Sequence, residues 1–223
     1  AGVDKRHEQI DLTPHVRSEN RKWQQRLLHY LEDRAGDDYV FPSGNFVKDY
    51  RFVHGMSVYF GSQLLDLNEA LGLKTALKLA PKAPLLAVRS FADRCFRYHL
   101  EARHLKGFSP EGFDEFYLQV ADLLELHPGS AGLVATSWYH DPALAQISPR
   151  LAYLLNGPVE GGAHIVKHKS TAFDVESATA KSKTRRVLYE SGEYLPVAYT
   201  WVWPREALIE WARRKRDISR PGS

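Results

Sequence analysis

Small, hydroxyl-bearing and basic side chains are concentrated in one segment, KHKSTAFDVESATAKSKTRR, at residues 167–186. Its second half is predicted to form a helix that begins near Ser177. Unpaired N–H groups at a helix N-terminus attract anions, small residues let a phosphate approach the backbone, and hydroxyl and basic groups donate hydrogen bonds to it. We therefore expect a phosphate-bearing cofactor at this helix start. Its expected ligands are Lys167, Ser177, Lys181, Ser182 and Arg185.

The same segment also fits a plainer interpretation. Asp174 and Glu176 are anionic residues close to the expected helix start, where they would stabilise the helix dipole themselves. The basic side chains would then simply face water. The glycine-rich fingerprints GxGxxG and GxxxxGK[ST] of nucleotide sites are both absent from the sequence.

A second group of chemically useful side chains lies in TSWYHDPALAQISPRLAYL, residues 136–154. His140 would be a general base near neutral pH, Asp141 would orient a cation, and Arg150 would hold a carboxylate or phosphate through two hydrogen bonds. We therefore assign catalysis to Tyr139, His140 and Asp141, and substrate binding to Trp138, Ser148 and Arg150. In the structural alternative, Asp-Pro and Ser-Pro form turns, the aromatic residues pack in the core, and Arg150 pairs with a carboxylate.

Other catalytic and metal-binding patterns are missing. His164 and His168 lie in an expected strand, where a spacing of four residues puts them about 13 Å apart, too far to share a metal ion. No HExxH motif occurs, and the single cysteine, Cys95, rules out multi-cysteine zinc sites and an intrachain disulfide. Ser137 has no GxSxG context. We expect no metal.

Apolar periodicity predicts the elements that would position these residues. In the first half, the expected elements are a helix at about 18–34, a loop or short hairpin at 39–55, a helix at 56–71, a buried strand at 83–90, and a helix that follows Ser90 and carries Cys95. In the second half, they are a helix at 109–126 capped by Ser109, strands at 131–140, 150–155, 162–168 and 196–203, and a last helix from Pro204 to about Arg216.

These elements predict an α+β or mixed α/β fold, with a helical N-terminal half and a C-terminal mixed β-sheet flanked by helices. We expect a helical region at 1–80 and an α/β domain at 81–223, packed as one compact unit. The net charge of +3 is modest, and no long apolar run suggests a membrane span. The chain is therefore expected to be soluble and cytoplasmic, with a small-molecule substrate.

The order of the expected elements from residue 83 to residue 216 resembles the GNAT acyltransferase fold. In that family, the fourth strand runs into a helix whose N-terminus grips the diphosphate of coenzyme A. The resemblance implies that residues 164–168 are that strand and residues 177–190 that helix. The segment that corresponds to the family's glycine-containing loop, residues 167–177, has no glycine.

Together these features favour an acyl-type group transferase that uses a phosphate-bearing, coenzyme A-type donor. The alternative is a nucleic-acid-binding or regulatory protein that uses basic helices at both termini, with Arg17, Arg21, Lys22 and Arg26 in one and Arg213, Arg214, Lys215 and Arg216 in the other. A third interpretation is a subunit without chemistry, whose aromatic surface binds another protein.

Overall fold

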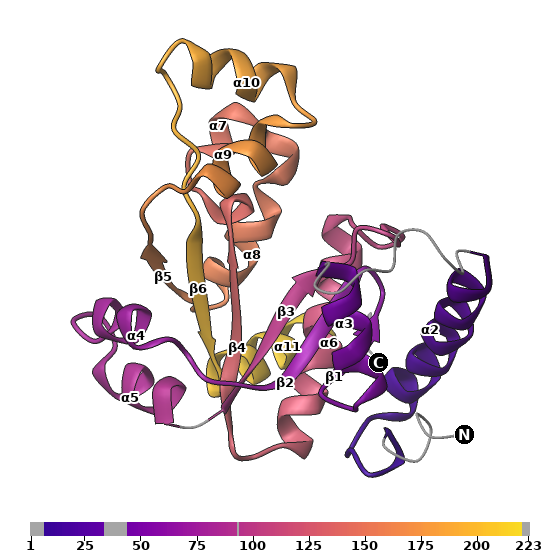
Figure 1. The fold of residues 1–223 in the computed structure, drawn as a ribbon. Coiled ribbons are helices and arrows are strands. Elements are labelled where there is room, and N and C mark those ends of the chain that lie inside the picture. Colours follow the sequence, from indigo (N-terminus) through magenta and orange to yellow (C-terminus); the bar gives the residue numbers. More distant parts are fainter. Residues whose placement is uncertain (1–6, 34–43, 93, 220–223) are drawn as a thin grey trace. The chain divides into compact units, whose positions relative to one another are not determined.

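The computed structural model describes residues 7–33, 44–92 and 94–219, and Figure 1 shows their arrangement. The chain divides into two compact units, each built from two segments. Unit 1 consists of Ala1–Glu69 and Arg94–Ser130, and unit 2 of Ala70–Asp93 and Ala131–Ser223. This division differs from the boundary near residue 80 expected from the sequence, because the chain leaves unit 1 after its second strand and returns for its third.

Unit 1 contains three antiparallel strands, β1 (Ser57–Phe60), β2 (Gln63–Glu69) and β3 (Arg94–Leu100). Phe60 pairs with Gln63, so a two-residue turn at Gly61 and Ser62 joins β1 to β2. Gly61 has φ +62°, a left-handed conformation that favours glycine. The helix predicted at 56–71 and the helix predicted after Ser90 are therefore wrong. Every residue of β1 is buried, so the strand shows no alternation that would have identified it.

Among the described residues, these strands are accompanied by the helices α2 (Pro14–Asp33), α3 (Gly44–Val53) and α6 (Pro110–Leu126). The helix expected from residue 18 is confirmed, although it begins earlier, at Pro14. The loop expected at 39–55 is wrong where it overlaps α3, and its residues 39–43 lie outside the described part of the chain. The predicted helix with a Ser109 cap is also confirmed, because the Ser109 side chain accepts a hydrogen bond from the Gly112 N–H.

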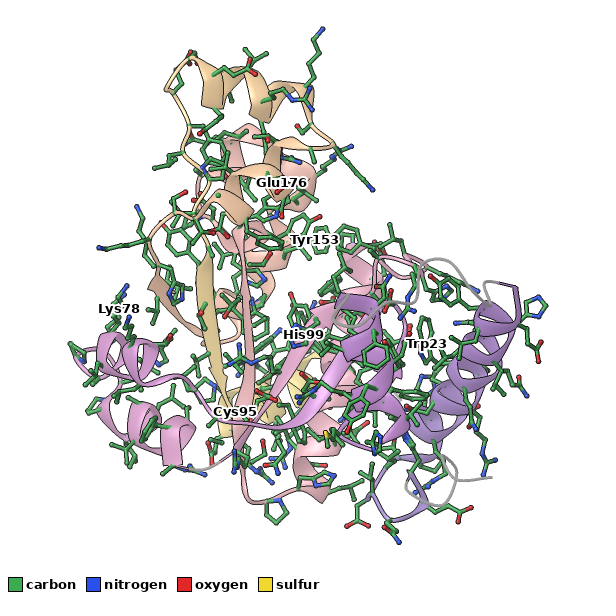
Figure 2. All side chains as sticks on the ribbon, viewed as in Figure 1. Trp23, Lys78, Cys95, His99, Tyr153 and Glu176 are labelled. Atoms are coloured by element: carbon green, nitrogen blue, oxygen red, sulfur yellow. The ribbon has the colours of Figure 1, made fainter. Side chains whose placement is uncertain are left out.

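The core of unit 1 joins α2 to β1. Trp23 stacks on Tyr59 with ring centroids 4.0 Å apart, and Figure 2 shows Trp23 on α2. The buried side chain of Asn20 accepts a hydrogen bond from the Tyr59 N–H at 3.0 Å and donates one to the Tyr59 carbonyl at 3.2 Å. This helix–strand contact therefore combines aromatic packing with fully satisfied backbone groups.

Unit 2 contains β4 (Ser130–Ser137), β5 (His164–Lys167) and β6 (Tyr199–Pro204), with β6 paired antiparallel to both of the others. The strands predicted at 131–140, 162–168 and 196–203 are thus confirmed. The final helix is confirmed as α11 (Arg205–Ser219). Both units combine helices with antiparallel strands, so the predicted α+β class is confirmed.

Two predicted strands of unit 2 are helical instead. The run at 83–90 lies in α5 (Pro84–Ala92), which follows α4 (Leu73–Leu79). Its apolar residues Leu85 and Val88 are exposed, so hydrophobicity alone does not indicate burial there. The run at 150–155 falls in the 3₁₀ turn η2 (Pro149–Leu151) and helix α8 (Tyr153–Glu160). Lys78 of α4, labelled in Figure 2, donates to the Lys167 carbonyl at 2.8 Å and ties α4 to β5.

Short helical elements of unit 2 lie alongside β6 and beyond the C-terminal end of β4 (Figure 1). They are the 3₁₀ turn η1 (Trp138–His140), α7 (Leu144–Ile147), α8, α9 (Ala172–Thr179) and α10 (Lys183–Glu190). Of the residues expected to do chemistry, five lie on these elements: Trp138, Tyr139, His140, Ser177 and Arg185. Asp141, Ser148, Lys181 and Ser182 lie in the connections next to them.

Candidate functional site

The single helix predicted to begin near Ser177 is two helices, and that prediction is wrong. Ser177 lies in the last turn of α9, two residues before its end, and not at a helix start. The break follows from a second cap: the Ser182 side chain accepts a hydrogen bond from the Arg185 N–H and starts α10. Hydroxyl residues therefore mark two helix starts, Thr171 and Ser182.

The start of α9 already carries its own anion. Thr171 and Asp174 form a capping box in which each side chain binds the other residue's backbone N–H. The buried Asp174 carboxylate accepts the Thr171 N–H at 3.0 Å and the Thr171 hydroxyl at 2.7 Å. Because this carboxylate occupies the helix start, a phosphate has no place there.

Arg185, in the first turn of α10, joins the two groups of residues predicted from the sequence. Its side chain is buried, with the residue only 5% exposed. Nε donates to the Ala178 carbonyl at 2.6 Å, and Nη1 donates to the Ser148 hydroxyl at 2.9 Å. The guanidinium carbon lies 4.7 Å from the centre of the Trp138 ring, in a cation–π contact. Trp138, Ser148 and Ser182, all predicted site residues, thus surround Arg185.

The charge of Arg185 has no carboxylate partner among the described residues. Burial lowers the pKa of Arg185, and the nearby Tyr139 and Tyr194 act in the opposite direction. The exposed Arg150 adds a second positive charge that lowers this pKa further. Nη2 donates to no group in the described part of the chain. A buried cation beside a like charge, with one free donor, is a local arrangement that an anion would stabilise.

Tyr139 lies next to this cation. Its ring stacks on Trp138 with centroids 3.9 Å apart, and the residue is half-buried. Burial raises the pKa of Tyr139, and the charge of Arg185 partly offsets that rise. The phenol is therefore protonated at neutral pH and is able to donate a proton.

His140 is completely buried. Its Nδ1 lies 3.2 Å from the Tyr199 carbonyl, so the neutral ring is assigned its proton on Nδ1. Burial lowers the pKa of His140 to about 4, against a smaller opposing effect of that hydrogen bond. The ring is consequently neutral at pH 7 and is enclosed by protein.

Asp141 and Tyr194 form a buried pair. One carboxylate oxygen of Asp141 accepts the Tyr194 hydroxyl at 3.2 Å, and the other accepts the Ala143 N–H at 3.1 Å. Asp141 therefore fixes the turn after η1 and holds Tyr194 near Arg185. Sequence reasoning missed Tyr194 as the partner of Asp141, because nothing in its local pattern indicates a contact with a residue 53 positions away.

The remaining predicted ligands lie apart from this contact network. Lys167 is exposed on β5, with its ammonium 5.9 Å from the centre of the Tyr199 ring. Lys181 is exposed in the connection between α9 and α10, and Ser177 is half-buried in α9. The structure thus brings Trp138, Tyr139, Ser148, Ser182 and Arg185 together, and these residues define the Arg185 cluster.

No group of three or more histidine, cysteine, aspartate or glutamate side chains among the described residues has metal-binding geometry. Within the same residues, no helix is both long and apolar enough to cross a bilayer. No family model matches the chain, nor does any curated protein or solved structure.

Proposed function

We propose that the Arg185 cluster binds a phosphate of a coenzyme A-type donor, and that the protein is an acyl-type group transferase. The observation that supports this proposal is the buried guanidinium of Arg185, which has the positive charge of Arg150 nearby and no carboxylate partner among the described residues. The two cations would share one phosphate, through Nη2 of Arg185 and the exposed guanidinium of Arg150. Ser148 and the Ala178 carbonyl orient the guanidinium before the donor arrives.

The cluster also supplies a group for the transfer step. The acceptor's nitrogen or oxygen would bond to the acyl carbon, the carbon–sulfur bond would break, and the thiolate would leave. The protonated phenol of Tyr139 would give its proton to the thiolate and regain one from the acceptor. His140 is enclosed, so its part in this scheme is to support the turn that carries Tyr139 and not to touch the substrate.

Binding and transfer are tested separately. Wild-type protein is titrated with coenzyme A, ATP and pyrophosphate by calorimetry at fixed ionic strength. A charge-assisted hydrogen bond contributes about 1.5–3 kcal/mol, so Arg150→Ala should weaken binding by about tenfold to a hundredfold. Arg185→Lys, which keeps the charge but cannot make both oriented bonds, should also weaken it. Arg186→Ala is the matched control, because Arg186 is the exposed neighbour whose Nη2 binds the Thr179 and Ala180 carbonyls.

Transferase activity is measured as thiol release from acetyl-coenzyme A with mixed amine and hydroxyl acceptors. Tyr139→Phe should slow release and leave coenzyme A affinity unchanged. If none of the phosphorylated compounds binds the wild type, the anion site is wrong. If they bind but no thiol is released with any acceptor, the protein is a binding module and the transferase assignment is wrong.

Several cations of the basic helices in the nucleic-acid alternative already have partners within the protein. Arg17 donates to the His7 and Ile10 carbonyls, and Lys22 pairs with Glu19 at 2.6 Å. On α11, Arg214 pairs with Glu210 at 3.3 Å. These contacts reduce the number of cations available to a phosphate backbone, so the transferase proposal is preferred.

A further inference from the structure

A pocket of about 310 Å³ lies within unit 1. Its walls come from α2, the turn between β1 and β2, the loop at 104–107 and the first half of α6. This volume is at the lower end of the range for small-molecule sites. The sequence patterns give no sign of it, because its lining residues come from four separate segments.

One wall carries a buried hydrogen-bond donor without a partner. Gln63 lines the pocket and is completely buried. Its Oε1 accepts the Ser62 N–H at 3.1 Å, and this bond fixes which end of the amide is oxygen. Nε2 has no hydrogen-bond partner among the described residues. Leaving such a donor unpaired costs about 1–3 kcal/mol, so an acceptor that reached it would be favoured.

The pocket also has two cations that form no ion pair with any described residue, Arg26 and Lys106. Its two carboxylates already have basic neighbours: Glu19 lies 2.6 Å from Lys22, and Glu115 lies 3.9 Å from His15. Three Lys and Arg cations against two carboxylates leave one unbalanced positive charge in the lining. That balance suits a monoanion better than a phosphate.

The positive charges of Arg26 and Lys106 both act on the ring of His104. Its Nε2 is 3.1 Å from Nη1 of Arg26, so the ring accepts that hydrogen bond. Burial lowers the pKa of His104, and the charges of Arg26 and Lys106 lower it further. A neutral ring therefore orients Arg26 without neutralising it, and a bound anion would raise this pKa.

Part of the pocket wall is apolar and closely packed. The buried rings of Phe60 and Phe116 lie with centroids 5.0 Å apart. Gly107 has φ +92°, and a Cβ on Gly112 would lie 2.1 Å from the Gly107 carbonyl oxygen. The loop thus packs directly on the start of α6, and only glycine allows this approach. A wall of this kind exists before a ligand binds.

We propose that this pocket binds a small organic carboxylate with an apolar body. The carboxylate would lie between Arg26 and Lys106, the apolar body would lie against Phe60 and Phe116, and a further acceptor on the ligand would pair with Gln63. This site belongs to unit 1 and is independent of the phosphate site proposed in unit 2.

The test uses benzoate, phenylacetate and hexanoate as probes, with benzamide as a neutral match for benzoate and inorganic phosphate as an anion without an apolar body. Full-length protein is titrated by calorimetry and by NMR of the histidine rings. At least one carboxylate should bind, benzamide should bind about tenfold more weakly than benzoate, and phosphate should not compete. Saturation should move the His104 resonance and raise the pH at which it titrates.

Variants locate the site. Arg26→Gln and Lys106→Gln should each weaken carboxylate binding by about tenfold. Arg21→Gln is the matched control, since Arg21 is also an exposed arginine of α2 and does not line this pocket. Lys106 is exposed, so its replacement leaves the fold intact even if another variant unfolds. The proposal is overturned if no carboxylate binds, if benzamide binds as well as benzoate, or if Lys106→Gln has no effect. Coenzyme A binding would be unaffected by these variants.

Discussion

Arg103 holds the carboxylate of Asp49 with both terminal nitrogens, Nη1 at 2.7 Å from Oδ2 and Nη2 at 2.8 Å from Oδ1. The same guanidinium binds Glu101 through Nε and Nη2, each at 2.9 Å. Both carboxylates are almost completely buried. Burial acts to raise the pKa of Glu101, but hydrogen bonds from Arg103 and nearby positive charge outweigh it, so the net shift is downward. One arginine thus compensates two buried charges that join α3 to the loop after β3.

Replacing Arg103 should therefore destabilise the protein strongly. Arg103→Ala leaves two buried carboxylates without their main partner, a change that typically costs about 3–5 kcal/mol. Arg103→Lys should restore only part of the stability that Arg103→Ala loses, because an ammonium cannot make the paired, planar contacts of a guanidinium. The free energy of unfolding is measured in urea at pH 7, with the exposed Arg21→Ala as control. A loss for Arg103→Ala no larger than that of the control would contradict the assignment.

His140 should make stability depend on pH between about 4 and 6.5. The folded protein keeps this ring neutral down to a pKa of about 4, whereas the unfolded chain protonates it near its ordinary value of 6.5. Between these values the unfolded state binds more protons, so stability falls as the pH is lowered through this window and is constant above it. The full effect is about 3 kcal/mol.

The measurement is the urea midpoint of unfolding at several pH values from 4 to 8, for wild type and His140→Asn. The asparagine amide keeps a donor for the Tyr199 carbonyl but does not titrate. Its curve should be flatter in this window. The slope that remains comes from His104 and His168, whose pKa values are also lowered by burial and nearby positive charge, and, near pH 4, from carboxyls such as Glu101 whose pKa is lowered. Parallel curves would show that His140 is not the titrating group.

Where several local signals agreed, the sequence predicted the structure. Helix α6 has a serine cap and a proline in its first turn, which both indicate the same first residue of the helix. Its apolar residues at helical spacing indicate which face is buried, so the signals agree. The strands β4, β5 and β6 were predicted from short runs between turn residues. The hairpin of β1 and β2 was missed because consecutive positions are buried, and such a run fits a helix or a strand equally well.

The candidate sites were predictable only as lists of residue types. Composition identified the hydroxyl and basic residues near Arg185, but the contact of Arg185 with Trp138 and Ser148 depends on how α10 packs on η1 and α7. In the same way, nothing local to Gln63 shows that its Nε2 donor lacks a partner among the described residues. Such features arise from contacts between residues far apart in the chain, and the local patterns of a single sequence do not show those contacts.

DNA and heparin should bind weakly, with affinity lost by physiological salt. The net charge is only +3, and several basic residues of α2 and α11 already have partners. Non-specific affinity scales with the number of phosphates neutralised, so the slope of log affinity against log salt should be small. A gel-shift series over increasing salt measures it. A sequence-selective complex that survives high salt would favour the nucleic-acid alternative over the transferase.

Alanine substitutions at two serines five positions apart, Ser177 and Ser182, test whether α9 and α10 are separate helices. Ser182 is the cap of α10, and its hydroxyl accepts the Arg185 N–H at 3.3 Å. Ser182→Ala removes that bond and should cost about 1 kcal/mol, within the range of 0.5–2 kcal/mol usual for a lost cap. Ser177 lies inside α9, where alanine is the better helix former, so Ser177→Ala should leave stability unchanged or raise it slightly.

Urea unfolding of both variants distinguishes the two helices from one continuous helix starting at Ser177. In a continuous helix, Ser177 would be the cap and Ser182 an interior residue, so the order of the two losses would be reversed. Thr171→Ala provides a positive control, because Thr171 caps α9 and should lose a similar amount. Since the Ser182 cap also fixes the first turn that carries Arg185, Ser182→Ala should weaken coenzyme A binding as well, while Thr171→Ala should not.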